Sequence, residues 1–228
     1  MIKSINNFFK SHIYITGLAI GTILFGSELF VYYITHTLNS YLNVAPTTLT
    51  SSALDNLIPL CPYFFIFYIY SYFFWMTSPM LIIKAGKKHM INFIIAYYIG
   101  IISGGLILLF YPTQMDRVAE GIYNLNKPGF FGWWLQFVYD ADGREMGYNL
   151  IPSFHCLNSV LYYLGVRKQP AISKSAKTYM LVMMLLILFS TVLVKQHFLI
   201  DVVCGTALAI VAYAVGMRLN LAEKIFHI

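Results

Sequence analysis

Charged residues are scarce in this chain. Only 11% of its 228 residues are Asp, Glu, Lys or Arg, against about 25% in a typical soluble domain. Hydrophobic residues reach 59%, above the usual 45–50% or so. So little charge cannot cover a surface that faces water on all sides, and the low charge together with the high hydrophobicity also excludes a disordered chain. The composition therefore predicts an integral membrane protein.

The chain also has few cysteines, with no paired spacing, and few acidic residues. The three cysteines Cys61, Cys156 and Cys204 lie in or beside apolar runs, and an odd number without paired spacing excludes a disulfide framework. Asp and Glu number 9 against 15 Lys and Arg, which gives a formal charge of +6. The basic residues stand in short clusters between apolar runs, a pattern typical of loops beside anionic lipid. We therefore expect the bilayer as the partner and no nucleic acid.

Long apolar runs are what the sequence has in abundance. A helix needs about 20 apolar residues to cross the hydrocarbon core of a bilayer. Runs of this size lie near residues 13–35, 58–83, 91–111, 149–166, 178–196 and 199–219. We expect residues 1–228 to form a single integral membrane domain, an all-α bundle of six transmembrane helices.

The distribution of basic residues predicts the direction of these spans. Eleven of the 15 Lys and Arg lie before the first span, after the sixth, or in the second-to-third and fourth-to-fifth connections. Glu223 is the only acid in those segments, whereas six acids lie in the connections on the other side and Asp201 lies at that end of the sixth span. The positive-inside rule then places both termini in the cytoplasm. We expect a multi-pass protein of the cell (plasma) membrane.

The longest connection, roughly residues 112–148, falls on the external side. Its run from Phe130 to Tyr139 contains two Trp and three Phe, and such residues are enriched at the headgroup level of a membrane. We expect an interfacial helix there on the outer leaflet. It could be a simple anchor in the aromatic belt, one wall of a lipid-entry groove, or both.

Four ionisable residues lie at the external ends of the spans, where burial makes such residues functional candidates. They are His155, His197, Asp201 and Arg117, and they come from three segments of the chain. His197 and Asp201 are four residues apart, so on one helix the carboxylate can accept the imidazole N–H and leave the other ring nitrogen free. A His–Asp pair of this kind can equally be a structural cap.

Ser153 and His155 stand where a loop passes into a helix, whose N-terminus offers free N–H groups to an anion. Arg117 and Lys195 add positive charge near them. Two imidazoles, a carboxylate and cations together suit a phosphate ester. Glu28, within the first span, could either pair with a cation of this site or face a polar cavity.

These residues resemble the motifs of a known family. Pro152-Ser153-Phe154-His155 is similar to the P-S-G-H motif of the type 2 phosphatidic acid phosphatase (PAP2) superfamily. The stretch from Ser190 through His197 to Asp201 resembles its third motif, S-R-x5-H-x3-D. Tyr111 to Arg117 lies where the first motif, K-x6-R-P, would end. Six spans with the motifs in this order extend the resemblance over nearly the whole chain.

The resemblance implies a metal-independent lipid phosphatase or phosphotransferase without a cofactor. His197 would attack phosphorus and form a phosphohistidine, Asp201 would orient it, and His155 would protonate the departing alkoxide. Arg117 and Ser153 would hold the phosphoryl oxygens. A zinc site is the metal alternative, and the residues that it would use are His155, Cys156, His197, Asp201 and Cys204.

The sequence departs from the family pattern at four positions. Phe110 replaces the lysine of the first motif, Val118 its proline, Phe154 the glycine of the second motif and Thr191 the arginine of the third. Lys195 is the residue that we expect to replace one of the missing cations.

Three functions remain open. The preferred one is hydrolysis of a lipid phosphomonoester or diphosphate at the external leaflet. The alternative is transfer of a phosphorylated headgroup to a lipid hydroxyl, as in the sphingomyelin and inositol phosphorylceramide synthases, relatives that also relax the basic residues. A non-catalytic transporter or scaffold with a degenerate site is the third.

Overall fold

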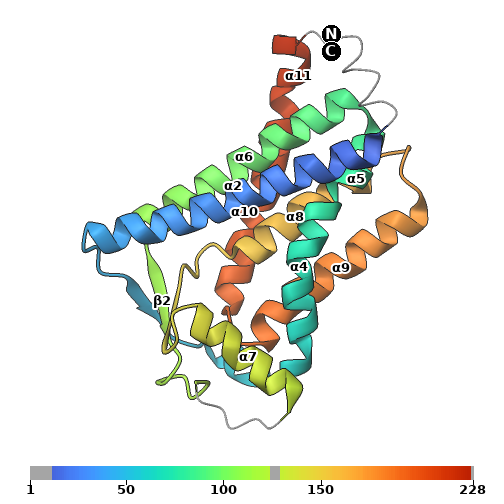
Figure 1. Ribbon diagram of the computed structural model, residues 1–228. Coiled ribbons are helices and arrows are strands. Elements are labelled where there is room, and N and C mark those ends of the chain that lie inside the picture. Colours follow the sequence, from blue (N-terminus) through green and yellow to red (C-terminus); the bar gives the residue numbers. More distant parts are fainter. Residues whose placement is uncertain (1–11, 124–128, 227–228) are drawn as a thin grey trace.

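The computed structural model describes residues 12–123 and 129–226, and the chain is mostly helical (Figure 1). Five helical segments among these residues are long and apolar enough to cross a membrane, which makes the chain an integral membrane protein. They are α2 (Ile13–Tyr41), the segment Pro62–Ala85, α6 (Lys87–Phe110), α9 (Lys174–Leu193) and the segment Leu199–Ile225. The second segment contains η1 (Pro62–Phe64), α4 (Phe65–Thr77), α5 (Pro79–Ile82) and η2 (Ile83–Ala85), and the fifth contains α10 (Leu199–Leu219) and most of α11 (Leu221–Phe226).

The sixth apolar run, expected as a span over 149–166, forms the shorter helix α8 (Phe154–Arg167). Its 14 residues extend about 21 Å, less than the roughly 30 Å of a hydrocarbon core. Length and composition therefore support five of the six expected spans. Twelve of the 14 residues of α8 are buried, so this helix is the centre of the bundle and the others surround it.

Small residues let the neighbouring helices approach α8 closely. A Cβ on Gly104 of α6 would lie 2.6 Å from the ring of Phe154, and one on Gly205 of α10 would lie 2.4 Å from the carbonyl oxygen of Ser153. On the side of α4, the indole of Trp75 donates a hydrogen bond of 3.0 Å to Ser159. The start of α8 is consequently held between α4, α6 and α10.

A small sheet, which the sequence did not predict, precedes α8. It consists of β1 (Thr47–Leu49), β2 (Thr113–Asp116) and β3 (Met146–Tyr148), with β1 parallel and β3 antiparallel to the central β2. Strands of three or four residues are too short to show an alternating pattern. The hydroxyl of Thr113 accepts the backbone N–H groups of Leu150 and Ile151, so β2 fixes the segment that leads into α8.

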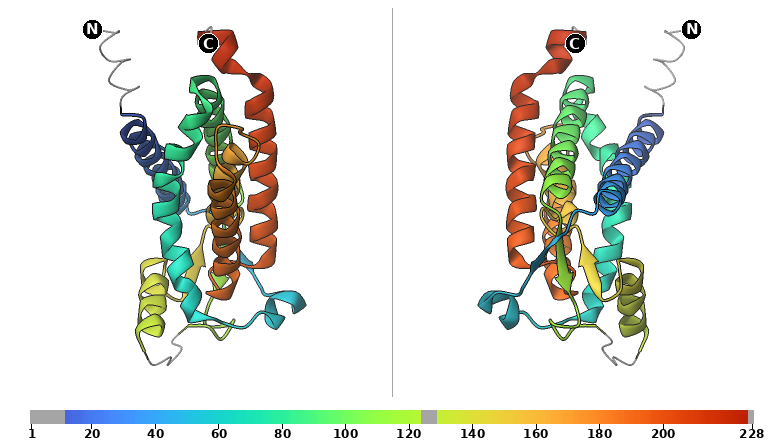
Figure 2. Two further views of the ribbon diagram at one scale, coloured as in Figure 1. Left: turned by 90° about the vertical axis from the view of Figure 1, so that its right-hand side faces the viewer. Right: turned by 90° about the vertical axis from the view of Figure 1, so that its left-hand side faces the viewer.

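The expected helix in the long connection exists as α7 (Phe130–Ala141). Its inner face buries Leu135 and Tyr139, whereas Phe130, Trp133 and Phe137 are exposed. Figure 2 shows α7 at one end of the bundle and α11 at the other, with the start of α2 on the same side as α11. The position of α7 on the outer leaflet stays a prediction. The two ends of the chain and residues 124–128 of this connection lie outside the described residues.

Candidate active site

The pair predicted at the start of the last span is formed. Nδ1 of His197 lies 3.2 Å from Oδ2 of Asp201, at hydrogen-bonding distance. The carboxylate is fully buried and the imidazole is 9% exposed. Because an ionised carboxylate only accepts, this contact favours the tautomer with the proton on Nδ1 and leaves Nε2 free as a base or nucleophile.

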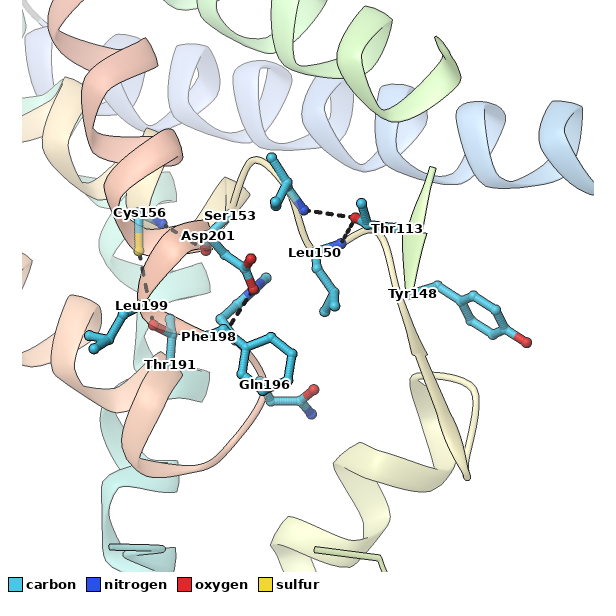
Figure 3. A network of polar contacts seen from close by, with 12 residues as sticks. Thr113, Tyr148, Leu150, Ser153, Cys156, Thr191, Gln196, Phe198, Leu199 and Asp201 are labelled. Atoms are coloured by element: carbon cyan, nitrogen blue, oxygen red, sulfur yellow. Dashed lines mark hydrogen bonds and ion pairs between the residues drawn. The ribbon is translucent and has the colours of Figure 1, made fainter. Parts of the chain in front are cut away.

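A sharp turn between α9 and α10 presents His197. The carbonyl oxygen of Thr191 accepts the backbone N–H groups of both Gln196 and His197, at 3.0 and 3.1 Å. Oδ2 of Asp201 also accepts the N–H of Phe198, at 2.9 Å, which caps the first turn of α10 (Figure 3). One buried carboxylate therefore orients the imidazole and caps the helix that follows it.

His155 reaches the same site from the first turn of α8. The centroids of the His155 and His197 rings are 6.2 Å apart. Tyr68 stacks on His155 at 4.2 Å, and Tyr72 and Trp75 contact it at 5.7 and 5.1 Å. Nε2 of His155 has no hydrogen-bond partner. A buried ring nitrogen without a partner, close to a second histidine, is a group that a substrate can satisfy.

The two histidines face one cavity of about 260 Å³. Its walls come from α2, α4, α7, α8 and the two turns that carry Asp142 and His197. Glu28 lines it as well, so the second of the two readings of this residue is the one that the structure supports. Aromatic rings form much of the remaining wall, contributed by Tyr32, Tyr33, Tyr68, Tyr72, Phe137, Tyr148 and Phe154.

Lys195 lies on the other side of His197. It lines a second cavity, of about 190 Å³, of which His197 is also a wall. Its ammonium group donates to the carbonyl oxygen of Asp55 at 2.9 Å. Burial lowers the pKa of Lys195, and Asp55 and Glu120 oppose this change. Whether it binds phosphate there stays a prediction.

Asp55, in the short helix α3 (Ala53–Leu57), had no signal in the sequence. Its carboxylate accepts the N–H of Leu199 at 2.8 Å and both the N–H and the hydroxyl of Ser52. Burial alone would raise the pKa of Asp55, but the hydrogen bonds from Ser52 and Leu199, with the charge of Lys195, hold it below its ordinary value. Asp55 thus fastens the start of α10 to α3.

Arg117 is enclosed rather than open to the cavity. Its guanidinium group is fully buried and donates to the carbonyl oxygens of Tyr139, Asp142 and Arg144, to the carboxylate of Asp142 and to Oε1 of Gln196. Burial raises the pKa of Asp142, while Arg117 opposes that shift. These contacts fix the loop after α7 against the turn that carries His197. A direct role for Arg117 in holding phosphate stays a prediction.

Ser153 is the N-cap of α8, and its hydroxyl accepts the N–H of Cys156 at 3.4 Å. Its own N–H donates to the carbonyl oxygen of Asp201 at 3.2 Å. The start of α8 and the first turn of α10 are joined directly by this bond, and Figure 3 shows the two residues side by side. Ser153 is fully buried, and its contact with phosphate also stays a prediction.

Of the six predicted site residues, His155 and His197 line the main cavity. Asp201 does not line it and contacts Nδ1 of His197 instead. Arg117 and Ser153 hold the surrounding backbone, and Lys195 faces the second cavity. Sequence reasoning missed Gln196, Asp142 and Asp55. Gln196 could have been noticed from its place beside His197, whereas the other two carry no local signal.

Within residues 12–123 and 129–226, no group of three or more His, Cys, Asp or Glu side chains is placed to hold a metal ion.

The fold and the site together define a membrane protein in which two histidines face one cavity among apolar helices, and an aspartate supports one of these histidines. A family model described as the PAP2 superfamily matches residues 38–215, most of the chain, and the chain belongs to that superfamily. Membership indicates phosphatase- or phosphotransferase-type chemistry on lipid phosphates. No curated protein and no solved structure gave a significant match.

Proposed function

We propose that the protein cleaves a lipid phosphate ester through a phosphohistidine on His197, with water as the final acceptor. The observation that carries this proposal is the placement of His155 and His197 on one cavity with ring centroids 6.2 Å apart. A phosphorus atom between the two rings would have a nucleophile on one side and a proton donor on the other.

In the first step, Nε2 of His197 attacks phosphorus while Asp201 stabilises the positive charge that develops on the imidazole. The bond from phosphorus to the lipid oxygen breaks, and His155 gives that oxygen a proton. In the second step, His155 takes a proton from water, which attacks the phosphohistidine and frees His197. Neither step requires a metal ion or a cofactor.

We also propose that the chain crosses the membrane six times, with α8 and the segment before it as the fourth crossing. Both termini would then lie in the cytoplasm and the site at the external leaflet of the plasma membrane. The opposite placement of α7 and α11 supports this orientation. The exposed rings of Phe130, Trp133 and Phe137 support α7 as the interfacial helix.

Headgroup transfer to a lipid hydroxyl is the second candidate, and a specific observation favours it. No Lys or Arg side chain of the described residues lines the main cavity. A phosphodiester carries less negative charge than a phosphomonoester and needs less compensation. The transfer uses the same first step, and only the acceptor in the second step differs.

The test is release of the lipid leaving group by the purified protein in detergent. This group is the lipid alcohol for a monoester or diester and the lipid monophosphate for a diphosphate. The panel contains phosphatidate, an isoprenyl diphosphate, a sphingoid phosphate and several phosphodiester lipids, with a chelator present and with or without a diacylglycerol or ceramide acceptor. We expect release to require His197, so His197→Ala lowers it by about a thousandfold or more. His36→Ala removes a histidine outside the main cavity and is the matched control. Release by His197→Ala at the rate of the unmodified protein would overturn the proposal.

A further inference from the structure

The cavity that faces both histidines has an unusual charge balance for a phosphate site. Its ionisable side chains are Glu28, Asp142, His155 and His197, with several tyrosines. Asp142 is already paired with the buried Arg117 at 2.7 Å. This leaves the carboxylate of Glu28 without a Lys or Arg partner among the described residues that line the cavity.

Glu28 is only 5% exposed, and its Oε2 has no hydrogen-bond partner. The polar neighbour on its inner side is Asn158 of α8, an uncharged amide. An ionised carboxylate that is buried without a cation costs several kcal/mol, and a cation that arrives with the ligand would offset that cost.

Aromatic rings surround the same space. Tyr32 and Tyr33 of α2 and Tyr68 and Tyr72 of α4 all line the cavity. Tyr32 is one turn from Glu28, so the two side chains lie on the same side of α2. Faces of aromatic rings attract cations, and a cluster of rings with a nearby carboxylate is the arrangement that recognises quaternary ammonium groups.

The rings also connect Glu28 with the reacting histidines. Tyr72 lies 5.7 Å from His155, and Tyr68 stacks on His155 at 4.2 Å. A ligand with its phosphorus between the histidines would therefore extend its headgroup along α2 and α4 toward Glu28. The outer rim of the cavity is apolar and exposed at Ile69 and Phe137, which suits acyl chains that remain in the bilayer.

We propose that Glu28 and the tyrosines of α2 and α4 bind the cationic headgroup of a zwitterionic phosphodiester lipid, of the choline type. This inference rests on the proposed function and names its substrate class. His197 attacks phosphorus, the bond from phosphorus to the diacylglycerol oxygen breaks, and His155 gives that oxygen its proton. The phosphorylated headgroup stays on His197 until water or a lipid hydroxyl takes it and returns a proton to His155.

The test compares lipids that have the same acyl chains and differ only in the headgroup. Diacylglycerol release is measured from phosphatidylcholine, phosphatidylethanolamine, phosphatidylglycerol and phosphatidate, and kcat and KM are determined separately. We expect the protein to prefer phosphatidylcholine to phosphatidylglycerol by at least about tenfold in kcat/KM. Glu28→Gln keeps the shape and removes the charge, and it should reduce this ratio about tenfold, mainly through KM for phosphatidylcholine.

Two further variants separate headgroup binding from a general effect. Glu223→Gln makes the same substitution at an exposed residue that pairs with Lys88 away from the cavity, and it should leave the ratio unchanged. Tyr72→Phe keeps the aromatic face and should keep most of the preference, whereas Tyr72→Leu should lose it. The thermal unfolding midpoint of each variant controls for folding.

Several outcomes would overturn the inference and leave the proposed function standing. They are preferential cleavage of phosphatidylglycerol or phosphatidate, an equal loss of kcat for all lipids in Glu28→Gln, and equal preferences in Tyr72→Leu and Tyr72→Phe. Absence of any turnover that depends on His197 would contradict the proposed function itself.

Discussion

At the scale of single residues, burial decides which polar groups can act. Asp201 is fully buried and has two partners on the same oxygen, the imidazole of His197 and the N–H of Phe198. Because its position is fixed by the first turn of α10, the imidazole that it holds is fixed as well. His155 is restrained differently, by ring contacts with Tyr68, Tyr72 and Trp75, and its Nε2 stays available.

Arg117 offers a test of stability at this scale. Arg117→Met would remove the buried guanidinium group that binds three loop carbonyl oxygens and the carboxylate of Asp142, whose side chain is 30% exposed, at a cost of about 3 kcal/mol. We expect a clearly lower thermal unfolding midpoint in detergent, measured by intrinsic fluorescence. The double variant Arg117→Met/Asp142→Asn should recover part of the loss, because the unpaired charge is gone.

Arg144→Met is the control for this test, since Arg144 belongs to the same loop and is exposed. It should leave the midpoint nearly unchanged. If Arg117→Met were as stable as the unmodified protein and lost activity only, Arg117 would act on substrate, and its enclosure in the loop would not be its main role.

The sequence predicted the residues whose relation is local. His197 and Asp201 are separated by one helical turn, so their contact follows from helix geometry alone. The contacts of Arg117 with Gln196 and Asp142 join segments 79 and 25 residues away, and no local pattern carries such information. The same reason explains why Asp55, which meets Leu199 over 144 residues, was missed.

At the scale of elements, α8 determines the depth of the site. Because the segment between β3 and α8 is bound by Thr113 of β2, the helix begins only at Phe154. The first turn of α8 consequently meets the first turn of α10 inside the bundle, and the bond from Ser153 N–H to Asp201 joins them. The length of an apolar run indicates how many residues are buried, but it does not indicate at which residue the helix begins.

The crossing of α8 and α10 can be tested at Gly205. A Cβ there would lie 2.4 Å from the carbonyl oxygen of Ser153, so Gly205→Ala must push the two helices apart. Overpacking of this kind costs about 1–3 kcal/mol. We expect a lower unfolding midpoint and at least a tenfold loss of activity, because α8 carries His155 and the first turn of α10 carries Asp201, which holds His197.

Gly26→Ala is the matched control for that crossing. A Cβ on Gly26 of α2 has no atom within 4 Å, and alanine favours a helix more than glycine does. The variant should be at least as stable as the unmodified protein and equally active. If Gly205→Ala behaved in the same way, the close contact of α8 with α10 would not govern the site.

At the scale of the whole molecule, the five long apolar helical segments of the described residues surround the short helix α8, and the site lies toward the end that carries α7 and the sheet. Hydrophobicity and charge predicted the membrane protein and most of its spans, because both depend on composition over long stretches. They could not predict the three-stranded sheet, whose strands are short and pair across 66 residues for β1 with β2 and 30 to 34 residues for β2 with β3.

The orientation in the membrane makes a prediction at this scale. The substitutions are Asp140→Cys in α7 and Lys168→Cys in the turn between α8 and α9. Both residues are exposed, and these two segments lie toward opposite ends of the bundle (Figure 2). With Cys61, Cys156 and Cys204 replaced, a membrane-impermeant maleimide should label the first in intact cells and the second only after permeabilisation. The reverse pattern would mean that the site faces the cytoplasm.

The central claim is that His197 becomes phosphorylated during turnover, and a rapid acid-free quench tests it most directly. The purified protein is mixed with a lipid substrate identified by the panel, quenched in alkali within milliseconds to seconds, and digested for mass spectrometry. We predict a phosphoryl group, with its headgroup if the lipid is a diester, on the peptide that contains His197, stable in alkali and lost in acid. Turnover that proceeds with no such modification, or with the modification on another residue, would contradict the account.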